Sequence, residues 1–591
     1  MPYKSHGISI PARIGWLRRR LFARGSEIGF VLLAILIGAM AGIVVSAIGF
    51  ISQFLHNRFY GIPLDAGLSG ADLPRSLLLI AVPVAGGLLT SLFMHLRRRR
   101  GGIVDPVEAN ALYGGRMSLG DSLWVSIQNL ASNGFGLSAG LEAAYTQLSS
   151  GLASTLGIKL KLRREDIRVL VGCGSAGAIA AAFGAPLTGA FYAFELIIGS
   201  YTTVSLAPVI AAAITATLIS QGLSGKSFEI EIGPIGAITA PDFLPALVLG
   251  GICAGLGILI MMTVVRTERL ASASGIPAWL RPAVGGILVG GVALITPQVL
   301  SSGHGAMHFN LENDIPWTAL LGLFCLKAAA SALTIGTGFR GGLFFASLLL
   351  GALVGKAAAV PLEWLAPGML SPTAMAVIGM SAFGVAVIGG PLTMTFLAME
   401  ISGEFPIAAL ALAASITSSL VVRQTFGYSF TTWRFHLRAQ SIRSAHDVGW
   451  IRNLTVGRLM RSDVRTANIN MTPDQFREAF PLGSTQRVIV TDDQGAYCAT
   501  VQVSEVQADL AAAEPRQALS DFFTHQGDVL LPGMNARQAA GIFEATQAES
   551  LAVVSDRIER RVVGSLSEAH TLRRYSEELD KQRRDITGVR D

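Results

Sequence analysis

Long apolar runs fill the first 440 residues of this 591-residue chain, and many of them are interrupted by Gly or Pro. A run of about 20 apolar residues can cross the hydrocarbon core of a bilayer as a helix. A helix that breaks inside the bilayer leaves backbone groups without partners unless they face protein or a wet cavity. The pattern therefore predicts a polytopic helical membrane protein whose broken spans line a polar path. The expected runs lie at residues 29–51, 76–96, 123–150, 168–199, 203–221, 243–265, 280–298, 318–336, 341–361, 373–401 and 406–422.

The charged residues are concentrated near the end of the chain. Residues 441–591 hold 39 of the 86 charged residues, although only 15% of the whole chain is charged. An average soluble domain is about 25% charged, which the tail matches. We expect a basic cytoplasmic N-terminus at residues 1–28, a membrane domain at residues 29–440 and a soluble domain at residues 441–591. The basic excess belongs to the membrane part, so it does not indicate a nucleic-acid partner.

Basic clusters flank the first two expected spans. The N-terminal segment is rich in Lys and Arg, and the second span ends in Arg97–Arg100. Basic flanks stay on the cytoplasmic side of a membrane, which places the N-terminus in the cytoplasm. We expect the soluble tail to be cytoplasmic as well. We expect a multi-pass protein of a bacterial inner (cell) membrane. An alternative role for the Arg run is attraction of lipid headgroups or anions.

A ten-residue segment occurs twice, 205 residues apart. Residues 186–195 read PLTGAFYAFE, and residues 391–400 read PLTMTFLAME. Pro, Leu, Thr, Phe, Ala and Glu recur at the same offsets. This repetition indicates a duplicated membrane half, and duplicated halves commonly place a substrate near the bilayer midplane.

With this repeat the chain resembles the ClC family of chloride channels and transporters, over roughly residues 30–440. The resemblance implies an inverted-repeat helical fold, a homodimer in the lipid bilayer and one anion pathway in each subunit. It implies a transport protein and not an enzyme. Helix N-termini form the anion site in that family, because free N–H groups and the helix dipole attract an anion without a full fixed charge.

Glu142 is the residue that the resemblance assigns as the gate. It lies in Gly140–Ala144, which resembles a Gly-Lys/Arg-Glu-Gly-Pro segment of the family, although Leu141 replaces the basic residue. Carboxylates inside a membrane are costly and therefore functional by default. In the family such a Glu occupies the anion's place and swings away. The alternative is a Glu paired with a neighbour for structural reasons.

Three further segments are expected to bind the anion. Gly342, Leu343 and Phe344 resemble the family's Gly-Gly-x-Phe helix start, with glycine packing as the alternative. Tyr428 resembles a Tyr that offers its hydroxyl to the central anion, with an interfacial Tyr as the alternative. Ile103 and Val104 stand in Gly102–Pro106, where the family has Gly-Ser-Gly-Ile-Pro. There Asp105 is either part of an altered anion loop or an N-cap.

Glu195 in the first repeat is a secondary acidic site. Proton-coupled members of the family usually have a second acid directly after this Glu, and here Leu196 follows. We expect Glu195 to have a structural role. The missing acid favours channel-like conduction over ordinary chloride/proton exchange.

The soluble tail also contains a duplication, at about residues 455–511 and 518–575, in which short apolar strands alternate with helices. It resembles a CBS pair, a regulatory and dimerisation module. Nucleotide-binding CBS domains usually carry a ribose-binding Asp where this chain has Gln507 and His570. The resemblance therefore argues against a bound adenine nucleotide, and no cofactor is expected. No Cys or His spacing typical of a metal site is present.

These features predict ClC-type anion transport, with chloride as the first substrate to test. The expected mechanism is channel-like or weakly proton-coupled, with Glu142 as the gate. The first alternative is a chloride/proton antiporter with a different inner proton route. The second is a non-conducting membrane sensor that signals through its CBS tail. The anion, the coupling ratio and the tail's ligand stay open.

Overall fold

The computed structural model describes residues 27–97, 102–224, 238–437, 454–511 and 516–587. The chain divides into two compact units, Met1–Asp447 and Val448–Asp591. The border expected after residue 440, and residues 1–26 of the expected basic N-terminus, lie outside the described residues. We describe each unit by itself.

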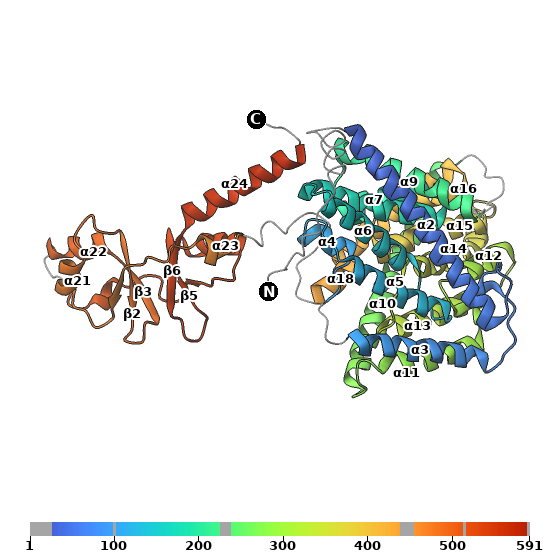
Figure 1. The fold of residues 1–591 in the computed structure, drawn as a ribbon, viewed down its shortest axis with the longest axis horizontal. Coiled ribbons are helices and arrows are strands. Elements are labelled where there is room, and N and C mark those ends of the chain that lie inside the picture. Colours follow the sequence, from blue (N-terminus) through green and yellow to red (C-terminus); the bar gives the residue numbers. More distant parts are fainter. Residues whose placement is uncertain (1–26, 98–101, 225–237, 438–453, 512–515, 588–591) are drawn as a thin grey trace. The chain divides into compact units, whose positions relative to one another are not determined.

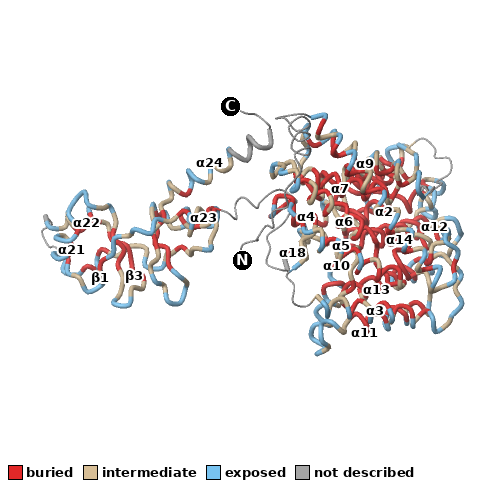
Figure 2. Tube along the Cα trace, in the orientation of Figure 1, coloured by how far each residue is buried: buried red, intermediate tan, exposed pale blue. Residues whose placement is uncertain are grey.

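The membrane unit is helical, and its buried residues gather in the middle of the helix assembly (Figures 1 and 2). In the described part, eight helices are long and apolar enough to cross a membrane. The first half contains α2 (Glu27–Tyr60), η1 (Leu68–Gly70), α3 (Leu78–Arg97), α4 (Pro106–Leu112), α5 (Leu119–Gly134), α6 (Glu142–Lys159), α7 (Arg164–Phe183), α8 (Pro186–Tyr192), η2 (Ala193–Ile198) and α9 (Thr203–Ser224). The second half contains η3 (Ala240–Asp242), α10 (Phe243–Ala273), α11 (Arg281–Ile295), η4 (Pro297–Val299), α12 (His304–Glu312), α13 (Trp317–Gly336), α14 (Phe344–Leu365), α15 (Pro372–Ile388), α16 (Pro391–Ser402), α17 (Phe405–Thr425) and α18 (Phe430–Leu437).

Several expected spans are two helices with a break between them, as the Gly and Pro positions predict. The run at residues 123–150 covers the end of α5 and the start of α6. The runs at 168–199 and 373–401 break at equivalent places in the two halves. Gly184 and Gly389 have φ angles of 68° and 89°, which residues other than glycine rarely adopt. Because Pro186 and Pro391 follow at the first helical position, each break begins a new helix.

Helix α2 shows how the outer helices face lipid. Its small residues, such as Ala34, Gly38 and Ala41, are buried, and a Cβ atom at Gly38 would clash with the backbone of Ala212 in α9. Large apolar residues on other positions of α2 are exposed, among them Phe50 at 63%. Close packing of small residues and exposure of large apolar ones are typical of helices in a bilayer.

The repeated Glu of each half caps the repeated helix of the other half. Glu195 accepts hydrogen bonds from the backbone N–H groups of Leu392 (3.1 Å) and Thr393 (2.9 Å), at the start of α16. Glu400 accepts from Leu187 and Thr188 at the start of α8, both at 2.8 Å. In each pair the Thr hydroxyl donates to the same carboxylate, at 2.6 and 2.7 Å. The helix starts are therefore satisfied reciprocally, which is a structural role for Glu195.

Two buried lysines donate hydrogen bonds to backbone carbonyls at helix ends. The ammonium of Lys327 donates to the carbonyls of Val299 (2.9 Å) and Ser301 (2.8 Å), after η4. Lys356 donates to the carbonyls of Asn310, Leu311 and Asn313 at the end of α12, at 2.6, 3.2 and 2.7 Å. A cation at the carbonyl end of a helix also interacts favourably with the helix dipole.

The tail has the duplicated α/β order that a CBS pair implies. Its first sheet joins β1 parallel to β2 and β2 antiparallel to β3, and the second sheet repeats this with β4, β5 and β6. The two sheets share a buried cluster that includes Tyr497 and Val554. The strands are β1 (Thr466–Asn468), β2 (Arg487–Thr491), β3 (Tyr497–Gln502), β4 (Val529–Leu530), β5 (Ser550–Val554) and β6 (Val562–Ser567). The helices are α20 (Val456–Leu459), α21 (Pro473–Ala479), α22 (Val503–Ala508), η5 (Asp509–Ala511), η6 (Leu519–Phe522), α23 (Ala536–Thr546) and α24 (Glu568–Thr587).

The reciprocal caps predict a matched loss of stability. Glu195→Gln and Glu400→Gln each replace one acceptor oxygen by an NH₂ group that faces a helix N-terminus. We expect each variant to be less stable by about 1–3 kcal/mol, because a buried donor loses its acceptor. The measurement is the thermal unfolding midpoint of the detergent-solubilised protein. Glu268→Gln, at an exposed position of α10, is the control, and equal midpoints for all three variants would contradict a capping role.

Candidate anion pathway and gate

Glu142 is the first residue of α6, and it lies deep inside the membrane unit. Only 5% of the Glu142 surface is exposed. The carboxylate accepts a hydrogen bond from the backbone N–H of Phe345, in the first turn of α14. Its atom Oε2 is buried and has no hydrogen-bond partner among the described residues. A carboxylate therefore sits at a helix N-terminus, as an anion would, but with half of its hydrogen-bonding capacity unused.

The loops that begin α6 and α14 are joined to each other. Gly140 and Gly342 form an isolated antiparallel bridge, with N–H···O distances of 3.0 Å from Gly140 and 3.4 Å from Gly342. A Cβ atom at Gly140 would clash with the carboxylate of Glu142. The glycine therefore makes room for the gate side chain beside the bridge, and the bridge brings Gly342 to the same place as Glu142.

Asn129 of α5 holds both loops. Its side-chain amide donates to the carbonyls of Gly140 (2.9 Å) and Arg340 (3.2 Å), and its oxygen accepts from the N–H of Ala144 at 2.9 Å. All the hydrogen-bonding atoms of this fully buried side chain are thus used by backbone groups around the gate. Sequence reasoning missed Asn129, although an Asn in a buried apolar segment is a usable signal.

Asn133, one turn after Asn129 in α5, also bonds to the loop that precedes Glu142. It donates to the carbonyl of Ala139 at 2.8 Å and accepts from the hydroxyl of Ser52 at 2.7 Å. His56 of α2 contacts the carbonyl of Asn133 at 2.9 Å through Nε2. The loop before Glu142 is therefore tied to two helices, and its conformation is fixed by side chains from outside the loop.

The start of α14 contains the other residues expected to bind the anion. Leu343 is the N-cap residue and offers no side-chain hydrogen bond to the helix. Leu343 and Phe344 are both buried, at 2% and 4% exposure, and the ring of His304 stacks on Phe345 with centroids 3.5 Å apart. The backbone N–H groups here are the positive end of the α14 dipole. Their function as an anion site stays a prediction.

Asp105 is the N-cap of α4. Its Oδ1 accepts from the N–H of Glu108 at 2.9 Å, as the N-cap alternative expects. The carbonyl of Val104 accepts from the amide of Gln147 in α6 at 3.0 Å. The Ile103–Val104 loop is therefore attached to the helix that begins with Glu142, while the roles of Ile103 and Val104 at an anion stay predictions.

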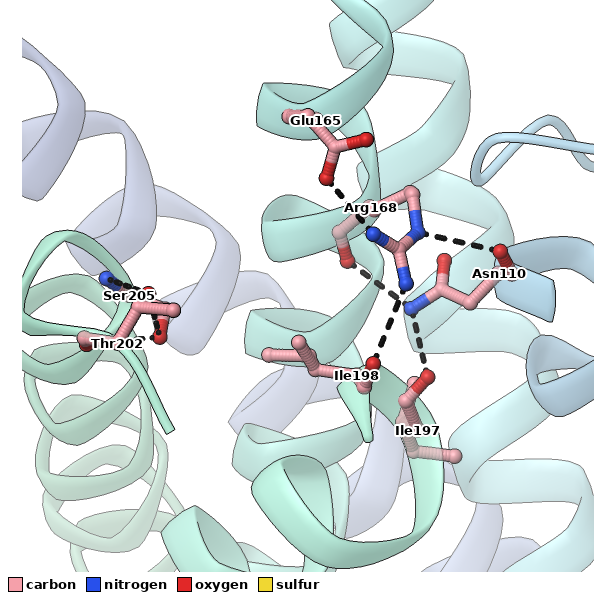
Figure 3. Close-up of polar contacts among 7 residues, drawn as sticks. All are labelled: Asn110, Glu165, Arg168, Ile197, Ile198, Thr202 and Ser205. Atoms are coloured by element: carbon pink, nitrogen blue, oxygen red, sulfur yellow. Dashed lines mark hydrogen bonds and ion pairs between the residues drawn. The ribbon is translucent and has the colours of Figure 1, made fainter. Parts of the chain in front are cut away.

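Helix α4 is held in turn by Asn110 and Arg168 (Figure 3). The guanidinium of Arg168 donates to the carbonyls of Asn110 (3.1 Å) and Ile198 (3.2 Å), and it pairs with Glu165 at 2.7 Å. The side chain of Asn110 donates to the carbonyls of Arg168 (3.1 Å) and Ile197 (2.9 Å). These bonds join α4, α7 and η2, and they hold the helix that follows the Ile103–Val104 loop in place.

A different tyrosine lies near the gate. Tyr192, the last residue of α8, packs on the ring of Phe344 with centroids 6.0 Å apart and is within electrostatic range of Asp105 and Glu142. Sequence reasoning missed it, although the second repeat has Leu397 at this place. Tyr428 packs on Phe426 and Trp433, with centroids 6.4 and 5.3 Å apart, and its role at the anion stays a prediction.

In the tail, the two positions considered for a nucleotide have other contacts. The amide of Gln507 donates to the carbonyls of Arg477 and Phe480, both at 3.1 Å, at the end of α21. Partial burial and the nearby Arg573 lower the pKa of His570. Neither side chain supplies a carboxylate for a ribose. Among the described residues, no group of three His, Cys, Asp or Glu side chains is placed to hold a metal ion.

Comparisons with known proteins give the family. The model of the voltage-gated chloride channel family matches residues 84–423. A putative chloride channel protein, ClcB-like, from Ralstonia nicotianae is 29% identical over 354 residues, which cover 58% of this chain and 82% of that protein.

Two solved structures have the same fold. A slow cyanobacterial Cl⁻/H⁺ antiporter aligns with a TM-score of 0.61 and 19% identity, over 69% of this chain and 97% of that chain. A eukaryotic CLC transporter aligns with a TM-score of 0.60 and 17% identity, over 94% of this chain and 98% of that chain. The family model covers more than half of the sequence, and the chain is a multi-pass membrane protein that belongs to the voltage-gated chloride channel (ClC) family.

Proposed function

We propose that the membrane unit carries small anions, with chloride as the first substrate, and that Glu142 is the gate. The observation that carries this proposal is the Glu142 carboxylate at the N-terminus of α14, with Oε2 unpaired among the described residues. A group that is attracted by N–H donors but incompletely bonded competes with a mobile anion without blocking it permanently. Anion entry, or protonation of the carboxylate, then displaces the side chain.

The transport is channel-like or weakly coupled to protons. Leu196 occupies the place where an inner acid would follow Glu195, and Glu195 uses its carboxylate to cap α16. A chloride/proton antiporter remains the alternative mechanism, because a protein of similar fold is a Cl⁻/H⁺ antiporter. We further propose a homodimer in a bacterial inner membrane with the N-terminus and the tail in the cytoplasm. The basic flanks of the first two spans support this orientation.

The tail is proposed to stabilise the dimer without a nucleotide. The Gln507 amide donates to the carbonyls of Arg477 and Phe480, and a neutral His570 has one acceptor nitrogen where a carboxylate has two acceptor oxygens.

Glu142→Gln tests the gate. The protonated carboxyl group is neutral and leaves the α14 N–H groups to the anion, so flux through the native protein should rise as pH falls. The Gln variant imitates the protonated state, and we expect high flux that is independent of pH from about pH 4 to about pH 7.5. The measurement is chloride efflux from liposomes that contain the purified protein.

Glu165→Gln is the matched control, because Glu165 pairs with Arg168 away from the α14 N-terminus. This variant should keep the pH dependence of the native protein. A pH profile of Glu142→Gln equal to the native one would refute the gate assignment, and absence of anion flux in the native protein would refute the proposed function.

Asn129→Ala tests how the gate is positioned. The variant leaves two carbonyls and one N–H of the gate loops without their partner, and we expect a loss of about 2 kcal/mol or more of stability together with weaker pH control of flux. Thermal unfolding and chloride efflux at two pH values measure both effects. Asn313→Ala removes a comparable amide from the exposed end of α12 and should change neither. Unchanged stability of Asn129→Ala would contradict the positioning role.

A nucleotide titration tests the tail. Isothermal calorimetry of the full-length protein with ATP and AMP should give no heat of binding above dilution. Saturable binding of either nucleotide that is lost in Gln507→Ala would overturn the proposal for the tail.

A further inference from the structure

We propose that Asp105 and Tyr192 form an inner proton route to Glu142, so that a proton reaches the gate without the acid that Leu196 replaces. The proposal rests on the proposed function of Glu142 as the gate. It names a coupling path through two residues that stand between the inner side of the membrane unit and the α14 N-terminus.

Tyr192 is within electrostatic range of both carboxyl groups. Its ring packs on Phe344, and the next residue, Phe345, donates its N–H to Glu142. On the other side, Tyr192 and Val104 pack against the same buried cluster, and Val104 is the neighbour of Asp105. Among the described residues, the carboxyl groups of Asp105 and Glu142 both interact electrostatically with Tyr192. A phenol is both a donor and an acceptor, so it can connect one carboxyl group to the other.

Asp105 is suited to take up the proton. It follows Arg97 by eight residues, and the proposed orientation places the end of α3 at the cytoplasmic side. The residue is half-buried, and the proposed route takes its proton from the cytoplasmic side. It caps α4, and an N-cap position keeps the side chain in one orientation toward its helix.

The charged groups around the route determine how readily its carboxyl groups carry a negative charge. Glu108 on α4 disfavours a second negative charge at Asp105, and Arg434 on α18 favours it. Tyr192 on α8 faces both Asp105 and Glu142, and on α6 Glu142 faces Tyr145 as well. Tyr145 is neutral when protonated, and Arg434 is the described cation within electrostatic range of Asp105.

The transfer leaves no charge on the tyrosine. A proton from cytoplasmic water binds the Asp105 carboxylate. The carboxylic acid then donates this proton to the Tyr192 oxygen, directly or through water in the anion path, while the Tyr192 O–H bond breaks and its proton passes to the Glu142 carboxylate. One O–H bond forms on Tyr192 as the other breaks, Asp105 becomes a carboxylate again, and Glu142 becomes neutral and free to leave the α14 N–H groups.

The test measures chloride and proton movement together. Full-length protein in liposomes is given an outward chloride gradient, and both ions are followed with electrodes. The route specifies the weakly proton-coupled form of the proposed function, so we expect the native protein to move protons uphill. Tyr192→Phe and Asp105→Asn should lower the ratio of proton to chloride flux at least about tenfold while chloride flux stays within about twofold. Asn serves as an N-cap as well as Asp does, so Asp105→Asn should fold.

Matched controls separate this route from general effects. Tyr113→Phe removes the hydroxyl of an exposed tyrosine at the end of α4, and Asp121→Asn removes the ion-pair partner of Arg97. Both should keep the native flux ratio.

The outcomes are distinguishable from those that bear on the proposed function. Native chloride flux without proton flux would overturn the route and leave anion transport standing. Native protein that moves neither ion would overturn the proposed function itself. An unchanged flux ratio in Tyr192→Phe and Asp105→Asn, or an equal loss of both fluxes, would also overturn the route.

Discussion

A helix that ends inside a membrane must have its free backbone groups satisfied by protein, and the membrane unit depends on this constraint throughout. Nearly every buried polar side chain described above contacts a helix end or a loop between helices. Glu195 and Glu400 accept hydrogen bonds from backbone N–H groups, and Lys327 and Lys356 donate to backbone carbonyls. Asn129 bonds to both kinds of group. These polar residues of a charge-poor unit are therefore its internal caps.

Glu142 differs from these caps, and the proposed gating function rests on that difference. The two half-buried capping carboxylates are well engaged, since Glu195 and Glu400 each accept at least three hydrogen bonds. Glu142 lies on a helix N-terminus too, but one of its oxygens is without a partner in the described part of the chain. Burial of an incompletely bonded carboxylate is costly. The difference between Glu195 and Glu142 is thus the difference between a permanent cap and a displaceable one.

The positions of the helix breaks could be predicted from the sequence, whereas the contacts that hold them could not. Glu142 as the gate stays a prediction. Gly and Pro report on backbone conformation locally, so the breaks at Gly184 and Gly389 could be predicted. The repeat and the resemblance led to Glu142 and to a structural Glu195. The bridge between Gly140 and Gly342, and the bonds of Asn129, join segments about 200 residues apart, and a local pattern does not encode such pairs.

The reciprocal caps also have a consequence for biogenesis. Leu187 and Thr188 precede their partner Glu400 by more than 200 residues, so the start of α8 has no cap when the first half enters the bilayer. It must wait until the second half has been synthesised and inserted. The two halves therefore mature as one folding unit, and a chain that stops between them would keep exposed helix ends in lipid, where quality-control proteases could recognise it.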